Sequence, residues 1–438
     1  MALKYQAPRG TRDLLPEELE RWQWAEDRAR DVLRRYGYRE IRTPMFEDYE
    51  LFARTSGESS DVVQKEMYRF KDLKGRDLAL RPEGTASVAR AYLEHSLSGQ
   101  GRTHRLWYQG PMFRYGRPQK GRFRQFYQIG AEIIGTDAPL ADVEMIALFV
   151  DLFEAWGFTG LAVAVNSVGT PETRRVYGEA LRAWLAPVRE ALSPDSQARL
   201  ETNPLRVLDT KVESDLALLR GEWPTGARPG ALPRMLDHLS PEDLVHWEAT
   251  LAGLTQAGIA YEIDHGLVRG LDYYTRTTFE VHDRSLGAQS TLGGGGRYDG
   301  LIAELGGPST PGVGFSIGLD RVMLVLEERR SGPEGRPASV YVVSMDGTRD
   351  AAIRLVRDLR RTFVVDCDLD RRGFNAQMKS AGKSGARCAL ILGEDEWAKG
   401  EVVIKQLDTG TQQSVPRERL ADALAAALGS APEPSARR

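Results

Sequence analysis

The pattern of the sequence changes type at residues 330–337, a short segment rich in glycine, proline and arginine. Composition of this kind is typical of a linker between domains. After it, strand-like and helix-like segments alternate in order, which predicts a small α/β domain over residues 338–438. Before it, paired strands and amphipathic helices are mixed, which predicts an α+β domain. The chain is therefore expected to contain domains of two different architectures.

In the first part of the chain, apolar residues recur at three- and four-residue steps over residues 16–36. This spacing predicts a helix, with Pro16 in its first turn and Gly37 after its end. Pro44 is expected to close the short strand that follows, because proline cannot donate to a sheet ladder. We further expect strands at residues 38–42, 106–113, 123–134 and 161–168, two strands around a turn within 67–80, and helices at 85–95 and 139–155.

Residues 169–260 differ from their surroundings, because helical periodicity is frequent there and strand signals are few. We interpret this region as a helical insertion that divides the α+β domain into residues 1–168 and residues 261–329. In the second part, the glycines at residues 293–296 predict a turn, and a strand is expected to lead into a helix that opens at Leu319. In the C-terminal domain we expect strands at 339–345, 363–369 and 387–392, helices at 349–361 and 375–383, and a disordered tail at 430–438.

Composition excludes several classes of protein. Hydrophobic residues make up 41% and charged residues 28% of the 438 residues, which excludes a disordered chain. Two cysteines, Cys367 and Cys388, cannot build a disulfide framework or a cysteine-rich zinc site, and the six histidines lack the spacing of a zinc-binding helix. Neither a signal peptide nor a long apolar segment is present. We expect a soluble, cytoplasmic protein without a membrane segment, and no metal ligands can be assigned.

Positive charge is concentrated locally, although the whole chain carries a net charge of −3. Residues 95–131 contain seven arginines and lysines, several aromatic residues and no acidic residue, and residues 371–393 are also basic and free of acid. Arginines beside aromatic rings suit a polyanion with stacking bases. A solvated β-hairpin with aromatic residues in the core would give the same pattern. Charge alone does not decide between these two interpretations.

Four further segments each have a functional and a structural interpretation. The glycines at residues 293–296 lack the Lys-Ser/Thr of a P-loop, and they fit either a close approach to a ligand or a tight turn. Thr85 is the expected N-cap of its helix, whereas Glu83 beside it suits an ammonium group. Arg269 stands between glycine-flanked segments and suits a cleft or a surface loop. Arg321 lies in a first helical turn, where a cation opposes the helix dipole unless an anion is near.

Together these segments resemble the class II aminoacyl-tRNA synthetases, and in particular the histidyl-tRNA synthetase family, over nearly the whole chain. The unit that ends at Pro44 is similar to the first class II motif, residues 110–126 are similar to the second, and residues 318–321 to the third. Residues 267–274 (LVRGLDYY) and 295–299 (GGRYD) resemble the histidine-specific motifs of that family, with RPEGT at 81–85 beside them.

The resemblance implies a catalytic domain built on an antiparallel sheet of six or seven strands bordered by helices, with a helical insertion and a C-terminal α/β anticodon-binding domain. It implies that L-histidine and ATP form histidyl-adenylate and pyrophosphate, with Mg²⁺ as cofactor. A tRNA(His) then accepts the histidyl group and AMP is released. A homodimer is also implied, since the first motif forms the dimer interface in this class.

The resemblance further assigns roles to individual residues. Catalysis is assigned to Arg269 and Arg114, which would both hold the α-phosphate. Histidine binding is assigned to Glu83, Thr85, Arg114, Gln128, Glu132, Arg269, Tyr273, Tyr274 and Tyr298. ATP binding is assigned to Arg114, Phe126, Arg269 and Arg321. Phe126 would stack on the adenine, and Arg321 would hold the γ-phosphate. Arg117 and Gln119 would contact the acceptor end of the tRNA.

Two positions depart from the family pattern. Tyr115-Gly116 stands where the family often has an acidic residue, and Tyr127 stands where a histidine is common. If Tyr127 points away from the ligand the pocket is unaffected, and otherwise its details differ.

Two alternatives are a non-catalytic relative, such as the regulatory subunit of ATP phosphoribosyltransferase, and a class II synthetase for another amino acid. The three arginines Arg114, Arg269 and Arg321 and the C-terminal domain argue against the first. The histidine-specific segments argue against the second.

Overall fold

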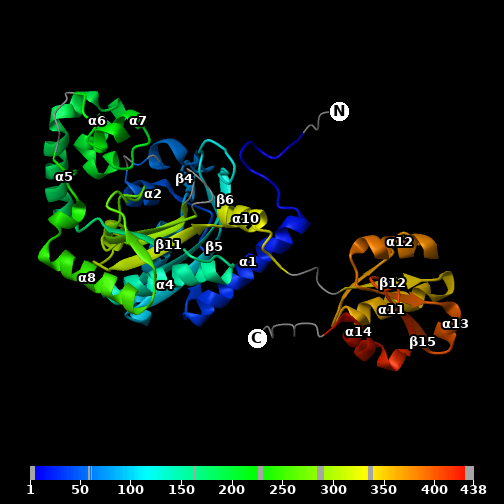
Figure 1. The fold of residues 1–438 in the computed structure, drawn as a ribbon. Coiled ribbons are helices and arrows are strands. Elements are labelled where there is room, and N and C mark those ends of the chain that lie inside the picture. Colours follow the sequence, from blue (N-terminus) through cyan, green and yellow to red (C-terminus); the bar gives the residue numbers. More distant parts are fainter. Residues whose placement is uncertain are drawn as a thin grey trace. The chain divides into compact units, whose positions relative to one another are not determined.

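The computed structural model describes residues 5–57, 60, 62–161, 163–224, 230–283, 291–333 and 339–429. The chain folds as two compact units, Met1–Gly332 and Pro333–Arg438 (Figure 1). The boundary falls within the predicted linker, of which residues 334–337 lie outside the described residues, as does the predicted tail at 430–438. In the ranges that are described, no helix has the length and apolar character needed to cross a bilayer.

A sheet of eight strands lies at the centre of the first unit. In order across the sheet, the strands are β1 Arg39–Glu40, β5 His104–Phe113, β6 Gln125–Ile134, β11 Gly312–Gly318, β10 Thr291–Arg297, β9 Thr275–His282, β7 Val163–Ser167 and β8 Tyr261–Ile263. Neighbours from β5 to β7 are antiparallel, whereas β1 and β8 run parallel to the strands beside them. The antiparallel sheet is confirmed, and the two parallel edge strands make the sheet wider than the six or seven strands expected.

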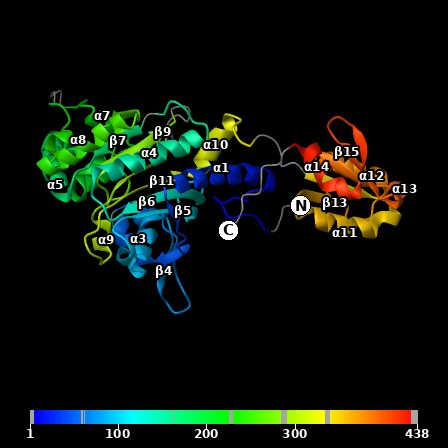
Figure 2. The ribbon, with the colours of Figure 1, turned by 90° about the horizontal axis from the view of Figure 1, so that it is seen from below.

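One face of this sheet is covered by four helices, α1 Pro16–Arg35, α4 Pro139–Ala155, α8 Pro241–Gln256 and α10 Leu319–Glu328 (Figure 2). Apolar side chains at alternate strand positions meet the apolar stripes of these helices. The ring of Phe149 in α4 lies 5.4 Å from that of Phe279 in β9 and 4.9 Å from that of Phe315 in β11. The helix predicted at residues 16–36 is therefore confirmed as part of this core, with Trp22 fully buried.

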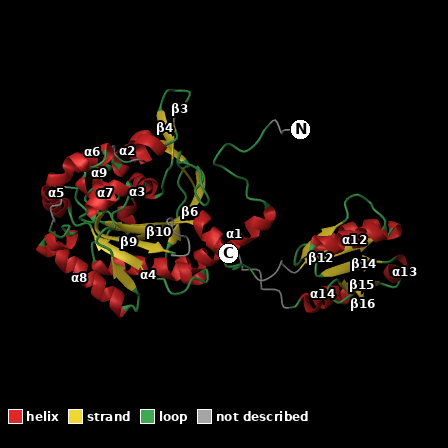
Figure 3. Cartoon of the chain, turned by 45° about the horizontal axis from the view of Figure 1, so that its top comes forward, coloured by secondary structure: helices red, strands yellow, loops and turns green. Residues whose placement is uncertain are grey.

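The opposite face is covered by α3 Thr85–Glu94, α9 Leu301–Glu304, α5 Pro171–Leu185, α6 Pro194–Thr202 and α7 Glu213–Leu219, which share a second apolar cluster with the sheet (Figures 1 and 3). On the same side lie α2 Tyr49–Ser56 and a small sheet of β2 Phe46–Asp48, β4 Asp77–Leu80 and β3 Arg69–Lys71. Within the predicted insertion, Thr173 of α5 donates to Asp243 of α8 at 2.7 Å, but the two helices belong to different apolar clusters. Trp247 and Leu254 of α8 pack into the core with α4.

The glycines at residues 293–296 form the middle of strand β10, so the turn predicted for them is wrong. They pair with β9 on one side and β11 on the other. A Cβ at Gly295 would collide with the carbonyl oxygen of Gly314 and lie 2.7 Å from the Cα of Phe315. A Cβ at Gly296 would lie 2.8 Å from the Tyr274 ring. These glycines are required by close packing on both faces of a central strand, not by a change of chain direction.

The second unit is a five-stranded sheet in the order β13 Val364–Cys367, β12 Ser339–Ser344, β14 Cys388–Leu392, β15 Glu401–Gln406 and β16 Gln412–Pro416. The first three strands are parallel and the last two antiparallel. Helix α12 Phe374–Ser384 covers one face, while α11 Arg349–Leu359 and α14 Leu420–Leu428 cover the other (Figure 3). The predicted α/β character is confirmed, and β15, β16 and the short α13 Glu394–Ala398 extend it.

The position of Gly295 makes a test of this packing possible. We expect Gly295→Ala to lower the free energy of unfolding of the first unit by about 3 kcal/mol or more, because the added methyl group meets backbone atoms that cannot rotate away. Gly99→Ala is the matched control, since nothing lies within 4 Å of a Cβ at Gly99. Urea unfolding of both variants measures the difference, and equal stability of the two would contradict this account of β10.

Candidate active site

The polar face of the central sheet is formed by the strand positions that alternate with the core. Gln128 and Glu132 in β6 and Glu280 in β9 lie on this face, between the buried core residues Ile129, Ala131, Ile133, Phe279 and Val281. A Cβ at Gly314 in β11 would collide with a carboxylate oxygen of Glu132. Because residue 314 is a glycine, the space above β11 is free, and the Glu132 carboxylate occupies it.

Glu132 is fully buried and accepts two hydrogen bonds from hydroxyl groups. Thr85 Oγ1 donates to its Oε1 at 2.7 Å and the Tyr298 hydroxyl donates to its Oε2 at 2.7 Å. Burial raises the pKa of Glu132 to about 8, although both hydroxyl groups act in the opposite direction. The carboxyl group is thus held in one orientation and is neutral in most molecules at pH 7.

Glu83 is the group that caps helix α3. Its carboxylate accepts from the backbone N–H groups of Thr85 at 2.6 Å and Ala86 at 2.9 Å. The N-cap position is Gly84, so the prediction of Thr85 as N-cap is wrong: its hydroxyl group turns to Glu132 instead. Burial raises the pKa of Glu83, and the two N–H donors and Arg114 oppose that shift. The capping and the ligand-binding interpretations therefore concern the same carboxylate.

Three tyrosines predicted for the pocket lie together beside Glu132. The ring of Tyr273 lies 4.7 Å from that of Tyr274 and 5.9 Å from that of Tyr298, and all three are buried. Burial raises the pKa of each of them, so their hydroxyl groups stay protonated and can donate hydrogen bonds. Gln128 is also buried, and its Oε1 has no hydrogen-bond partner in the part of the chain that is described.

Arg269 reaches this face from the loop before β9 and forms an ion pair with Glu280. Burial opposes the charge on both groups. The pair nevertheless raises the pKa of Arg269 above its usual range and lowers that of Glu280 to about 2, with His282 assisting at 3.1 Å from Glu280. Sequence reasoning missed Glu280. The signal was present, because a carboxylate between Phe279 and Val281 must face away from the core.

Two further arginines lie on the same side. Arg114 Nε donates to the carbonyl oxygen of Pro82 at 2.9 Å, and its guanidinium lies 5.6 Å from the centre of the Phe126 ring. Arg321, in the first turn of α10, donates to the carbonyl oxygen of Thr291. Burial lowers the pKa of both arginines. Thr291 also donates to Glu280 at 3.2 Å, which connects Arg321 to the Arg269–Glu280 pair.

Arg117 and Gln119 lie on the exposed loop between β5 and β6 and not among the buried pocket residues. Gln119 is fixed by backbone hydrogen bonds with Arg122, and Lys120 at the loop tip pairs with Glu328 at 2.9 Å. The structure thus brings together all the residues predicted for histidine and ATP and leaves the two predicted for tRNA at the surface.

Tyr127 points away from the pocket. Its ring lies 5.2 Å from that of Trp22 in α1, and its backbone N–H donates to Asp320 at 2.8 Å. The departure from the family pattern at this position therefore leaves the pocket unchanged.

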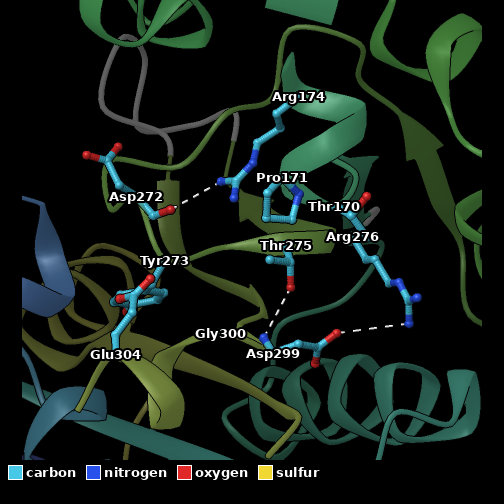
Figure 4. Close-up of a pocket in the computed structure, with 10 residues that line it drawn as sticks. All are labelled: Thr170, Pro171, Arg174, Asp272, Tyr273, Thr275, Arg276, Asp299, Gly300 and Glu304. Carbon is cyan, nitrogen blue, oxygen red and sulfur yellow. Dashed lines mark hydrogen bonds and ion pairs between the residues drawn. The ribbon is translucent and has the colours of Figure 1, made fainter. Parts of the chain in front are cut away.

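A cavity of about 310 Å³ lies beside Tyr273, and Figure 4 shows its lining. Arg174 of α5 donates there to the carbonyl oxygens of Asp272 at 3.2 Å and Tyr274 at 2.9 Å. Arg276, which has a φ of +50°, approaches Asp299 at 4.0 Å. Arg174 thus holds the segment that carries Tyr273 and Tyr274. Sequence reasoning missed Arg174, because its partners lie about a hundred residues further along the chain.

Two family models match the chain, in agreement with its two units. The model described as "Histidyl-tRNA synthetase" matches residues 10–322, and the model "Anticodon binding domain" matches residues 339–427. Both matches lie within the corresponding compact unit.

Curated relatives match over almost the full length. A histidine–tRNA ligase of Thermosynechococcus vestitus is 47% identical over 416 residues, which cover 95% of each chain. A histidine–tRNA ligase of Geobacillus thermodenitrificans is 45% identical and covers 96% of this chain and 98% of its own.

Solved structures agree with these matches. The apo histidyl-tRNA synthetase of S. aureus superposes with a TM-score of 0.80 at 35% identity, and covers 96% of this chain and 99% of its own. A Bacillus halodurans protein titled "ATP phosphoribosyltransferase regulatory subunit/histidyl-tRNA synthetase" superposes with a TM-score of 0.62 at 24% identity, over 87% of this chain and 97% of its own, and so shares the fold. The pocket unites the segments at residues 81–85, 267–274 and 295–299, and the similarity to these ligases covers almost the full length. The chain therefore belongs to the histidyl-tRNA synthetase family.

Proposed function

We propose that the pocket on the polar face of the sheet joins L-histidine to tRNA(His) in two steps. A carboxylate oxygen of histidine attacks the α-phosphorus of ATP, histidyl-adenylate forms and pyrophosphate leaves. A ribose hydroxyl group of the tRNA then attacks the histidyl carbonyl carbon, and AMP leaves. The observation that carries this proposal is the convergence of Arg114, Arg269 and Arg321 beside the buried Glu132–tyrosine pocket.

The amino acid would lie between Glu83 and Glu132. The ammonium group would bind Glu83, Thr85 and Gln128, which offer oxygen acceptors. Thr85 gives its hydroxyl hydrogen to Glu132, so its lone pairs remain available. The imidazole would bind Glu132 and Tyr274, with Tyr273 and Tyr298 as walls. A pocket that hydrogen-bonds an imidazole rejects apolar side chains of similar size, because its buried polar groups would be left unpaired.

The phosphates would bind the three arginines, Arg114 and Arg269 at the α-phosphate and Arg321 at the γ-phosphate, with the adenine stacked on Phe126. Arginine suits this role because it stays charged and binds phosphate with two parallel hydrogen bonds. The ion pair with Glu280 orients Arg269 before any substrate arrives. A guanidinium has five N–H donors, so Arg269 can bind Glu280 and an anion together.

A magnesium ion would enter with ATP. The described ranges contain no group of three carboxylate, histidine or cysteine side chains that could hold a metal ion by itself. Magnesium usually binds one or two carboxylates together with substrate phosphates, and Glu280 beside Arg269 and Arg321 offers such a carboxylate. When bound, the ion would neutralise phosphate charge.

The remaining parts would serve the tRNA and assembly. We assign residues 1–168 and 261–329 to the catalytic domain, 169–260 to a helical insertion that ends with the sheet-packed α8, 330–337 to the linker and 338–438 to anticodon binding. Arg117 and Gln119 on the exposed loop would contact the acceptor end of the tRNA. A homodimer is supported by exposed apolar residues next to the first motif, Met45, Phe46 and Phe70, which are 52%, 53% and 41% exposed. The place of action would be the cytoplasm.

The first test is amino-acid-dependent exchange between ATP and pyrophosphate by the purified protein. We expect exchange with L-histidine, and none above background with other amino acids, because only histidine satisfies Glu132 and the tyrosines. The measurement uses a panel of amino acids with magnesium present. A folded sample that shows no exchange with histidine would overturn the proposed function.

Arg269 is the arginine whose role is tested most directly. We expect Arg269→Ala to lower exchange activity by about a hundred-fold or more, since a preoriented donor at the reacting phosphate is lost. Arg28→Ala is the matched control, because Arg28 is exposed and lies over Trp24 on α1, which covers the other face of the sheet. Exchange activity within a few-fold of the control would contradict the proposed role of Arg269.

Glu132 predicts a dependence of stability on pH. Its pKa is raised on folding, so the folded protein holds this proton more tightly than the unfolded chain does. The resulting stability is present below the ordinary carboxyl pKa and is lost as pH rises toward about 8. The loss from one such group is at most about 1.4 kcal/mol per pH unit.

Glu132→Gln mimics the neutral form and has no proton to lose. We expect its free energy of unfolding, measured in urea at pH 5, 7 and 9, to increase relative to that of the natural protein as pH rises. A constant difference between the two proteins would show that Glu132 is ionised throughout.

A further inference from the structure

The basic loop between β5 and β6 is accompanied by a carboxylate from a distant part of the chain. Residues 114–124 contain five arginines and lysines and no acidic residue. Glu66, the last residue of the short helix Val62–Glu66, lies beside the start of this loop. The backbone N–H of Tyr115 donates to the carbonyl oxygen of Glu66 at 2.6 Å, and the rings of Tyr68 and Tyr115 lie 5.5 Å apart. The backbone of Glu66 is therefore attached to the loop.

The Glu66 carboxylate lies against Gly116. A Cβ at Gly116 would lie 3.5 Å from Glu66 Oε1, so the missing side chain leaves this side of the loop open to the carboxylate. Glu66 is half-buried, and within the described residues no hydrogen bond or ion pair to its carboxylate oxygens is formed. The group is thus an acceptor with free lone pairs, on a residue whose backbone is attached to the loop.

Glu66 also lies near the proposed nucleotide site. Its charge opposes the effect of burial on the pKa of Arg114, more strongly than that of any other acid, and Arg114 lies over Phe126 at 5.6 Å. The carboxylate therefore belongs to the same neighbourhood as the ring on which the adenine would stack. A carboxylate near bound phosphates is unfavourable unless a cation or a hydrogen-bond donor meets it.

We propose that Glu66 accepts a hydrogen bond from the 6-amino group of an adenine and so selects 6-aminopurines. This inference rests on the proposed function. In that reaction the ammonium group of histidine is met by Glu83, Thr85 and Gln128, and the phosphates carry no N–H donors. In the adenine base, which would stack on Phe126 near Arg114, the sole N–H donor is the 6-amino group. It is present in ATP and in the terminal adenosine of tRNA, and a 6-oxo group in its place would meet the carboxylate with a second acceptor.

The experiment compares adenine with hypoxanthine in each step of the reaction. Pyrophosphate exchange is measured with ATP and with inosine triphosphate, and single-turnover histidyl transfer is measured with tRNA that ends in adenosine or in inosine. The variants are Glu66→Ala, which removes the acceptor, and Glu66→Gln, which keeps a neutral one. Glu50→Gln is the matched control, since Glu50 is an exposed carboxylate on the neighbouring α2, 3.8 Å from Arg54.

We expect Glu66→Ala to lower kcat/KM for ATP about ten-fold or more and to leave inosine triphosphate and the KM for histidine nearly unchanged, with Glu66→Gln between the two. If the loss of discrimination is confined to the transfer step, the adenine recognised is that of the tRNA, and the proposal stands. An equal loss for adenine and hypoxanthine in both steps would overturn it, because Glu66 would then act only through Arg114 or the fold. Unchanged discrimination would overturn it as well.

These outcomes are separate from a failure of the proposed function itself. Absence of histidine-dependent exchange in the natural protein refutes that function. Normal exchange in the natural protein, together with unaltered discrimination in Glu66→Ala, refutes only the role of Glu66.

Discussion

The packing of Phe149 against Phe279 and Phe315 fixes which face of the central sheet is polar. Side chains alternate along a strand, so Phe279 in the core places Glu280 on the other face. In the same way, Ala131 and Ile133 place Glu132 there. A slip of one residue in register would bury both carboxylates among phenylalanine rings, which is prohibitively costly. The geometry of the candidate active site is therefore a consequence of the core on the opposite side.

The buried acidic side chains of the pocket, charged or neutral, have partners before any substrate arrives. Glu280 is paired with Arg269, Glu83 caps helix α3 through two N–H groups, and Glu132 accepts from two hydroxyl groups. An unpaired charge at such depth would cost several kcal/mol, so these contacts stabilise the pocket. They also hold the groups in the orientation that a ligand requires, and less reorganisation is needed when it binds.

The sequence was most informative where the relevant contacts are local or periodic. The helical spacing around Trp22 predicts α1, and the motif residues from Arg114 to Arg321 lie in one pocket as expected. The prediction failed at residues 293–296, because the need for glycine comes from Phe315, a neighbour in space and not in sequence.

The same limit explains the other differences. The cap of α3 depends on whether the Thr85 hydroxyl group or the Glu83 carboxylate binds the backbone N–H groups. The hydroxyl group donates to Glu132, 47 residues away, so Glu83 forms the cap. Arg174 was missed because the tyrosine segment that it holds lies about a hundred residues away. In the second unit, the antiparallel strands β15 and β16 follow the alternating strands and helices, and an α/β pattern does not predict them.

The net charge of −3 can now be understood in spatial terms. The basic segment at residues 95–131 has no acid of its own, yet the fold brings acids to it: Glu144 to Arg105, Glu328 to Lys120, and Glu66 and Glu83 to the surroundings of Arg114. Arg105, Arg114 and Lys120 therefore have acids beside them, whereas Arg117, in the same loop as Lys120, stays exposed. A polyanion therefore meets positive charge at a few positions and not along a continuous basic surface. Because non-specific attraction grows with the number of phosphates neutralised, this distribution favours a specific partner over other polyanions.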